Sequence, residues 1–163
     1  MSSSDRRLFL LSGLAALAGC GFAPVYGPGG GGDALMGQVR VTDPQGRAGF
    51  LLTREIEARL GRPETPRYEL RPAIALRSEA IAIDRSNVAA RANLIGTVNY
   101  TLTDLETGEK VDSGKVTNFT GYSTFDTPIV TRAAARDAEA RLMQMLADQM
   151  LTRLAAAAAS RSR

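Results

Sequence analysis

The sequence has 163 residues, of which 44% are hydrophobic, and this length fits one ordinary domain with a core of its own. It contains one cysteine, no histidine and no tryptophan. An intramolecular disulfide is therefore excluded, and so are the common nucleophile–base arrangements and most zinc sites. The formal net charge of +3 is mild. We expect no nucleic-acid partner, no metal site and no cofactor.

Residues 1–19 have the three regions of a secretory signal peptide. Arg6 and Arg7 precede an apolar run from Leu8 to Ala18, and small residues end it. A transmembrane helix needs roughly 20 apolar residues, and this run has about half that number. The two arginines fit an ordinary signal and a twin-arginine signal equally well, so the export route stays open.

The only cysteine, Cys20, follows this signal directly. Leu17-Ala18-Gly19-Cys20 resembles the lipobox of bacterial lipoproteins, in which the signal is removed and the cysteine becomes an acylated N-terminus. A thiolate is nucleophilic enough to take a glyceride at sulfur, and more than one acyl chain makes anchoring stable. We predict a lipid anchor at Cys20. The alternative is a soluble secreted protein with a chance cysteine.

A segment rich in glycine and proline separates Cys20 from the domain. Residues 20–34 include an extended lead, Phe22 to Pro28, and four consecutive glycines, and they are interpreted as a flexible tether. Residues 35–159 are predicted to form the domain, and residues 160–163 a frayed tail.

The first half of the domain alternates between strand and helix patterns. Residues 38–42 alternate polar and apolar, which predicts a short strand. Residues 48–60 have a helical repeat, carried by Phe50, Leu52, Ile56 and Leu60, that Gly61 and Pro63 end. A strand follows from residue 68, and its apolar residues change parity at Ile81, which indicates a bulge or bend near residues 78–80.

The second half predicts two further strands and a long helix. Residues 84–87 form a turn, residues 88–105 a strand, residues 106–109 a hairpin turn and residues 110–125 the last strand. Thr127-Pro128 begins a helix that runs to about Ala158. The predicted fold is α+β: two helices packed on one face of a roughly four-stranded sheet, in the order β-α-β-β-β-α.

One face of the predicted strand 88–105 is rich in uncharged polar groups. Such a face suits the polar lumen of a membrane β-barrel, although a solvated antiparallel face has the same composition. Basic side chains near this sheet could bond the phosphates of a lipid headgroup, or they could be ordinary surface charges. The candidate contacts are Arg77, Arg85, Arg91, Asn93, Thr97, Asn99, Lys110 and Lys115.

Acidic residues give little support for an enzyme. Glu55 and Glu57, like Glu106 and Glu109, have solvent-side spacing and no partner base or metal ligand nearby in the sequence. Two carboxylates can hydrolyse a glycosidic bond, but no aromatic sugar platform accompanies these pairs. We expect a protein that is not an enzyme.

Two segments resemble one family, the lipopolysaccharide-assembly lipoprotein LptE, in its alphaproteobacterial form. They are residues 17–27, LAGCGFAPVYG, and the final helix with its opening Phe125-Asp126-Thr127-Pro128 and its ending 147–154, ADQMLTRL. The resemblance implies a domain of two helices and four strands in the lumen of the outer-membrane barrel LptD. It also implies assistance in barrel assembly and delivery of lipopolysaccharide to the outer leaflet, without catalysis.

The same resemblance implies the location. Gly21 is not the aspartate that tends to retain such lipoproteins in the inner membrane, so the protein is expected at the outer membrane, facing the periplasm. Two alternatives remain: a stand-alone periplasmic lipid-binding lipoprotein, and an accessory lipoprotein of an envelope transporter. The lipid-binding alternative predicts an apolar pocket between helices and sheet, whereas the barrel plug predicts a filled core and a binding outer surface.

Overall fold

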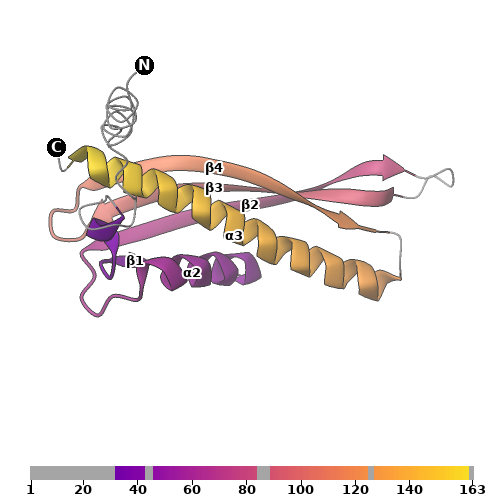
Figure 1. The fold of residues 1–163 in the computed structure, drawn as a ribbon, viewed down its shortest axis with the longest axis horizontal. Coiled ribbons are helices and arrows are strands. Elements are labelled where there is room, and N and C mark those ends of the chain that lie inside the picture. Colours follow the sequence, from indigo (N-terminus) through magenta and orange to yellow (C-terminus); the bar gives the residue numbers. More distant parts are fainter. Residues whose placement is uncertain (1–31, 43–45, 84–88, 125–126, 162–163) are drawn as a thin grey trace, which may run out of the picture.

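A long antiparallel meander forms most of the sheet (Figure 1). The computed structural model describes residues 32–42, 46–83, 89–124 and 127–161. Its two α-helices and four strands confirm the predicted α+β fold and element order. The elements are the 3₁₀ turn η1 (Asp33–Leu35), β1 (Val39–Val41), α2 (Gly46–Leu60), β2 (Tyr68–Ile83), β3 (Ala89–Asp104), β4 (Lys110–Ser123) and α3 (Pro128–Arg161).

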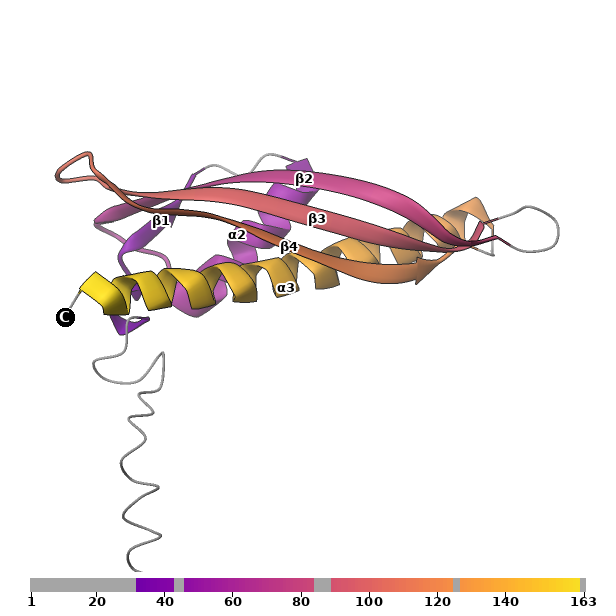
Figure 2. The ribbon, with the colours of Figure 1, turned by 90° about the horizontal axis from the view of Figure 1, so that it is seen from above.

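The sheet is mixed, with the strands in the order β1-β2-β3-β4. β1 pairs parallel with β2 across the intervening helix α2, and the other pairs are antiparallel. Figure 2 shows α3 running along most of the length of the meander. In contrast, α2 lies beside only the half of the sheet nearer the C-terminus of α3 (Figure 1).

Local sequence sets the helix ends. Gly61, at φ 77°, terminates α2, and its N–H donates to the carbonyl of Glu57 at 2.9 Å. A left-handed residue at this position is the usual glycine stop of a helix. Pro128 begins α3, where its fixed φ suits the first helical position and its missing N–H costs nothing. Thr131 N–H donates to the Thr127 carbonyl and closes the first turn.

The core lies between α3, α2 and the inner face of the sheet, and it is filled. Residues spaced by three and four along α3 present an apolar stripe to the alternate residues of β3 and β4. Side chains at most 2% exposed include Leu142, Met143, Leu146, Met150 and Leu154 of α3, Leu52 and Ile56 of α2, and Leu70, Val98, Leu102 and Val116 of the sheet.

Some element boundaries and faces differ from the sequence prediction. Phe50, expected on the apolar face of α2, is 58% exposed, because Leu51 and Leu52 take the core-facing positions. Helix α3 continues through Ser160 and Arg161, two residues assigned to a frayed tail, because the Arg161 guanidinium bonds the backbone carbonyl of Val111. The predicted turn 84–87 falls outside the described residues.

Extra residues at the ends of the long strands fix their pairing. In β2, Ala80 pairs with Ala92 and Ala82 pairs with Arg91, so Ile81 is an extra residue. The bulge at Ile81 lies one residue beyond residues 78–80, near which the parity change predicted it. In β4, Lys110 pairs with Thr103 while Asp112 pairs with Leu102, so Val111 is also extra. Such a residue reverses which side chains of the strand face the core.

Candidate functional site: the outer face of the sheet

The sheet face turned away from both helices, here called the outer face, carries most of the candidate residues. Odd-numbered residues of β3 lie on it, because the even-numbered ones pack against α3. Register places three residues side by side in each row across β2, β3 and β4. The successive rows are Glu79–Asn93–Gly121, Arg77–Ile95–Phe119, Ala75–Thr97–Thr117, Ala73–Asn99–Lys115 and Arg71–Thr101–Ser113.

The middle of the outer face is neutral and made of short side chains. Thr97 and Thr117 hydroxyls lie 3.2 Å apart, and one donates to the other across the strand pair. Ala75 completes the row, so all three of its side chains are short. In the next row Asn99 lies directly opposite Lys115. Asn93, Thr97 and Asn99 therefore share one surface, which the alternation along the strand predicted, and the register of β4 adds Lys115 to it.

The remaining basic candidates are spread along the sheet. Arg77 is exposed and pairs with Glu79 of its own strand at 2.9 Å. Arg91 lies near one end of β3, while Lys110 lies opposite Thr103 near the other end. At about 3.4 Å per residue these ends are roughly 40 Å apart, so Arg91 and Lys110 do not form one site. Arg85 and Cys20 lie outside the described residues.

Sequence reasoning missed Phe119. Its side chain is 60% exposed on the outer face, in the same row as Ile95 and Arg77. The exposed ring and the neighbouring isoleucine form a small apolar patch on an otherwise polar surface. The sequence did not show that Phe119 faces outward, because the extra residue Val111 determines which side chains of β4 lie on the outer face.

An ion-pair network ends the outer face at the β1 edge. Glu69 accepts from Arg40 at 2.9 Å and from Arg71 at 2.6 Å, and the glutamate is only 7% exposed. The hydrogen bond from Arg40 lowers the pKa of Glu69, against the opposing effect of burial, and Arg71 adds to the lowering. The carboxylate therefore stays charged and holds β1 against β2.

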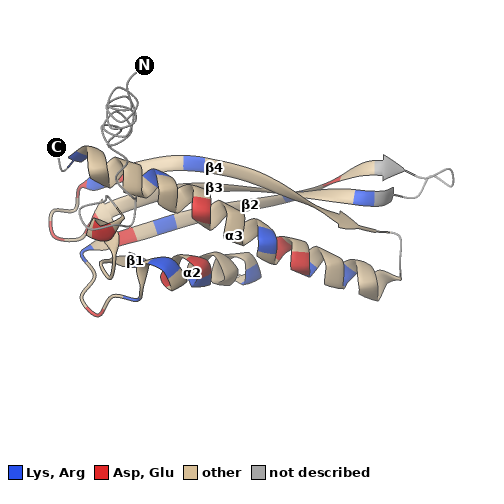
Figure 3. Cartoon of the chain, in the orientation of Figure 1, with Lys and Arg blue, Asp and Glu red and all other residues tan. Residues whose placement is uncertain are grey.

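Figure 3 shows acidic and basic residues interspersed over strands and helices. On the outer face the six basic side chains of Arg40, Arg71, Arg77, Arg91, Lys110 and Lys115 outnumber the two carboxylates of Glu69 and Glu79. The surface is therefore moderately positive, and its neutral middle row, Ala75–Thr97–Thr117, lies between rows that contain Arg77 and Lys115.

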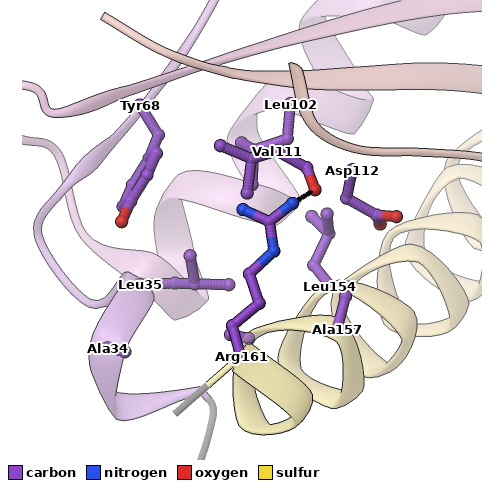
Figure 4. A pocket seen from close by; sticks show the side chains of 10 residues that line it. Ala34, Leu35, Tyr68, Leu102, Val111, Asp112, Leu154, Ala157 and Arg161 are labelled. Atoms are coloured by element: carbon purple, nitrogen blue, oxygen red, sulfur yellow. Dashed lines mark hydrogen bonds between the residues drawn. The ribbon is translucent and has the colours of Figure 1, made fainter. Parts of the chain in front are cut away.

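The core offers little room for a ligand. Side chains fill the space between α3 and the sheet. A hollow of about 230 Å³ lies beside this core, at the end near η1 (Figure 4). Sites for small molecules measure roughly 300–1,000 Å³. Among residues 32–42, 46–83, 89–124 and 127–161, no group of three acidic, histidine or cysteine side chains could hold a metal ion. In that same part of the chain, no helix is long and apolar enough to cross a membrane.

The sequence from residue 36 to residue 154 matches the family model described as LptE, lipopolysaccharide-assembly. The chain belongs to the LptE family. Membership gives it a role in lipopolysaccharide assembly. No curated protein sequence matches the chain.

Solved structures share the fold of this LptE-family chain. A lipoprotein from Caulobacter crescentus CB15 is 26% identical, with a TM-score of 0.67, over 80% of this chain and 97% of that one. The rare lipoprotein B from Shewanella oneidensis is 13% identical, with a TM-score of 0.61, over 77% and 98%. A minor lipoprotein from Acinetobacter baumannii is 15% identical, with a TM-score of 0.55, over 73% and 89%.

Proposed function

We propose that this LptE-family chain is an outer-membrane lipoprotein, anchored through Cys20 and facing the periplasm, that partners an LptD-type β-barrel. It acts as plug and assembly factor and takes part in lipopolysaccharide transport and insertion, without catalysing a reaction. The observation that carries the proposal is the pairing of a filled core with a long outer face that is turned away from both helices and has short polar side chains in its middle row.

The chemistry of the outer face supports a barrel lumen as its partner surface. The lumen of a membrane β-barrel is lined by polar side chains. Threonine and asparagine both donate and accept hydrogen bonds, so the row of Thr97 and Thr117 and the neighbouring Asn99 can match such a wall. The short side chains Ala73 and Ala75 allow close approach of another strand surface.

The lipid-binding alternative has less support. A protein that encloses an acyl chain needs a continuous apolar cavity, and the space between α3 and the inner sheet face is occupied by side chains such as Leu146 and Met150. The hollow near η1 is too small to serve as one. The proposal therefore places the working surface outside the core.

Site-specific photocrosslinking tests the outer face. A photoreactive residue at Thr97, on the outer face, is compared with one at the exposed Gln144 of α3. The lipidated protein is recovered from outer membranes in mild detergent, and its partners are identified by mass spectrometry. We expect a large β-barrel in near one-to-one amount and a strong crosslink to it from Thr97. Recovery without a barrel, or a crosslink from Gln144 alone, would overturn the proposal.

Replacing the anchor cysteine tests the location. Cys20→Ser removes the thiol that would carry the lipid. In a host without the barrel partner, the variant is expected in the soluble periplasmic fraction, whereas the parent chain sediments with outer membranes. Equal sedimentation of both proteins, after a carbonate wash that strips peripheral proteins, would contradict the predicted anchor.

A further inference from the structure

The edge of β2 that faces away from β3 is open over most of its length (Figure 2). β1 covers only its beginning, and the pairing of the two strands ends at Val41 and Leu70. Thr42 N–H donates to the Leu70 carbonyl at 3.0 Å, so even-numbered residues of β2 direct their N–H and C=O groups toward this edge. In the described part of the chain, no hydrogen bond reaches the edge-facing backbone groups of Ile74, Leu76, Ser78 and Ala80.

The open stretch of the β2 edge has a defined length. At one end Pro72 has no N–H to offer at an edge-facing position, and at the other end the bulge at Ile81 interrupts the strand. Proline and bulges are features that stop a sheet edge from pairing with another strand. Between Pro72 and Ile81 the strand pairs regularly with β3, so its free groups are evenly spaced and ready to bind another strand.

The opposite edge of the sheet is already occupied. Arg153 and Arg161 of α3 donate to the backbone carbonyls of Lys115 and Val111 in β4. The chain therefore offers one open edge rather than two. When two copies pair through the same edge, the contact closes on itself and does not propagate into a fibre.

The side chains along the open edge are complementary to those of a second copy. Arg77 and Glu79 lie on the outer face with side chains 68% and 52% exposed. If two β2 strands pair antiparallel around a two-fold axis beside Ser78, Arg77 of each copy lies directly opposite Glu79 of the other. On the inner side, Leu76, which is 39% exposed, then lies opposite Ala80.

Charge also favours this register over its neighbour. An axis beside Arg77 would set the two copies of Arg77 opposite each other, and like charges in direct opposition destabilise a strand pair. With the axis beside Ser78, the residues that face each other as hydrogen-bonded pairs are Leu76 with Ala80 and Ser78 with its own copy.

We propose that the open edge of β2 binds a second copy of this chain, with the two β2 strands antiparallel around a two-fold axis beside Ser78. Backbone groups alone accept any extended strand, and the placement of Arg77 and Glu79 selects the second copy. In the pair, the outer faces of the two copies form one continuous surface. This goes beyond the proposed function, because it needs neither the barrel nor lipopolysaccharide.

Sedimentation velocity of the purified protein tests the pairing. The full chain is produced with Cys20→Ser, so that neither lipid nor detergent contributes to association. We expect the fraction of dimer to rise with concentration. A protein that stays monomeric from micromolar to near-millimolar concentration would overturn the proposal.

Ser78→Pro shows whether the β2 edge makes the contact. The substitution removes the edge-facing N–H at the centre of the pair but keeps the ladder to β3, and Pro72 occupies a position of the same parity. Each dimer loses two hydrogen bonds, so we expect its dissociation constant to rise about tenfold or more.

Ser78→Ala is the matched control for Ser78→Pro. It keeps the N–H and removes only the hydroxyl, which lies 2.9 Å from the hydroxyl of Tyr122. It is expected to associate like the parent, and circular dichroism compares the folds of the two variants. Equal association of Ser78→Ala and folded Ser78→Pro would refute the edge as the contact.

Charge reversal tests the register with substitutions at exposed positions. Glu79→Arg sets an arginine opposite Arg77 of the second copy and is expected to weaken the dimer several-fold. Adding Arg77→Glu restores opposite charges and is expected to restore association. A double variant that associates as weakly as Glu79→Arg would overturn the register.

Disulfide trapping does not depend on how well Ser78→Pro folds. In the Cys20→Ser background, Ser78→Cys is the only cysteine, and its Cα lies about 5.5 Å from that of the second copy in a hydrogen-bonded pair, within the range of a disulfide. Ser113→Cys, at an exposed serine of β4, is the control. Mild oxidation is expected to crosslink Ser78→Cys several-fold faster, and equal rates would contradict the proposed axis.

Discussion

Gly96 of β3 lies directly beneath Leu142 and Leu146 of α3. A Cβ atom at this position would lie 2.8 Å from Leu146 Cδ1 and 3.0 Å from Leu142 Cδ2, so these buried leucine side chains would have to shift. Overpacking costs about 1–3 kcal/mol, and alanine recovers about 0.5–1 kcal/mol of glycine's conformational cost. We expect Gly96→Ala to lower the free energy of unfolding by about 1 kcal/mol, as measured by urea denaturation.

Gly121 is the matched control for Gly96, because it is also a strand glycine but lies on the outer face. The nearest atom to its added Cβ is Asn93 Oδ1 at 3.6 Å, an ordinary contact. Gly121→Ala is expected to be neutral or slightly stabilising. Equal destabilisation by the two substitutions would show that the loss reflects strand backbone rather than contact with α3.

Glu69 is expected to make the free energy of unfolding depend on pH in the acidic range. Hydrogen bonds from Arg40 and Arg71 lower its pKa in the folded chain. Its charged form therefore stabilises the fold above the unfolded pKa, near 4.3, and this contribution is lost as pH falls through the lower folded pKa. At pH 7 we expect Glu69→Gln to cost about 1 kcal/mol, since both arginines are largely exposed.

Urea denaturation of the parent protein and of Glu69→Gln, near pH 7 and again near pH 3, checks this expectation by measuring the free energy of unfolding. The difference in the free energy of unfolding between Glu69→Gln and the parent is expected to be smaller near pH 3 than near pH 7. The exposed Glu64→Gln serves as the control for the loss of one surface charge. A difference that is the same at both pH values would mean that Glu69 acts through packing.

At the scale of elements, arginines from α3 protect the outer edge of the sheet. The backbone carbonyl of Lys115 accepts from Arg153 at 2.7 Å, and that of Val111 accepts from Arg161. Both carbonyls belong to β4, an edge strand, and exposed edges are templates for pairing with other chains. The helix thus covers the inner face and also occupies part of the edge.

Removing one of these arginines should expose the edge. Arg153→Met retains an apolar stem against the sheet but loses the hydrogen bond. We expect a stability loss of at most about 1 kcal/mol together with faster aggregation, followed by light scattering at matched concentrations. Arg136→Met, at an exposed position of the same helix, is the control. Equal aggregation of the two variants would show that Arg153 does not protect the edge strand β4.

Helices and strands were predictable because their periods persist over many residues. The repeat that ends at Leu154 and the alternation around Val98 each extend well beyond one turn or pair, so local exceptions do not obscure them. Phe50 was misplaced because Leu51 and Leu52 are both apolar, and the sequence alone does not show which of three successive positions faces outward.

The candidate site was only half predictable for a different reason. Asn93, Thr97 and Asn99 share one strand, so their common face follows from period two alone. Phe119 and Thr117 join them through register, and register depends on one bulged residue, Val111. A turn sequence does not reveal a bulge, so cross-strand neighbours could not be assigned.

For the whole molecule, unequal coverage of the sheet predicts unequal local stability. Strand β3 is covered by α3 around Val98 and Leu102, whereas the part of β2 from Leu76 to Ile81 is exposed on its inner face as well. Regions with few buried contacts open without global unfolding. We expect amides near Val98 to exchange with deuterium far more slowly than those near Asn93, as measured by hydrogen exchange with mass spectrometry.

The comparison of exchange rates has an internal control. Amides near Val98 and Asn93 belong to the same strand and are bonded on both sides, to β2 and β4. Strand pairing is therefore equal, and the two positions differ in the facing part of β2, where Ile74 is half-buried and Ala80 is exposed. Similar exchange at the two positions would show that the meander is held together by its own ladders rather than by α3.

The parallel pairing of β1 with β2 also bears on the order in which the chain folds. β2, β3 and β4 are consecutive in sequence and can zip from their turns, with contacts that begin only a few residues apart. Val39 must instead find Tyr68 across the whole of α2, and closing that longer loop costs more entropy. The meander is thus expected to form early and β1 to join late, so a chain interrupted during folding would already display most of the outer face.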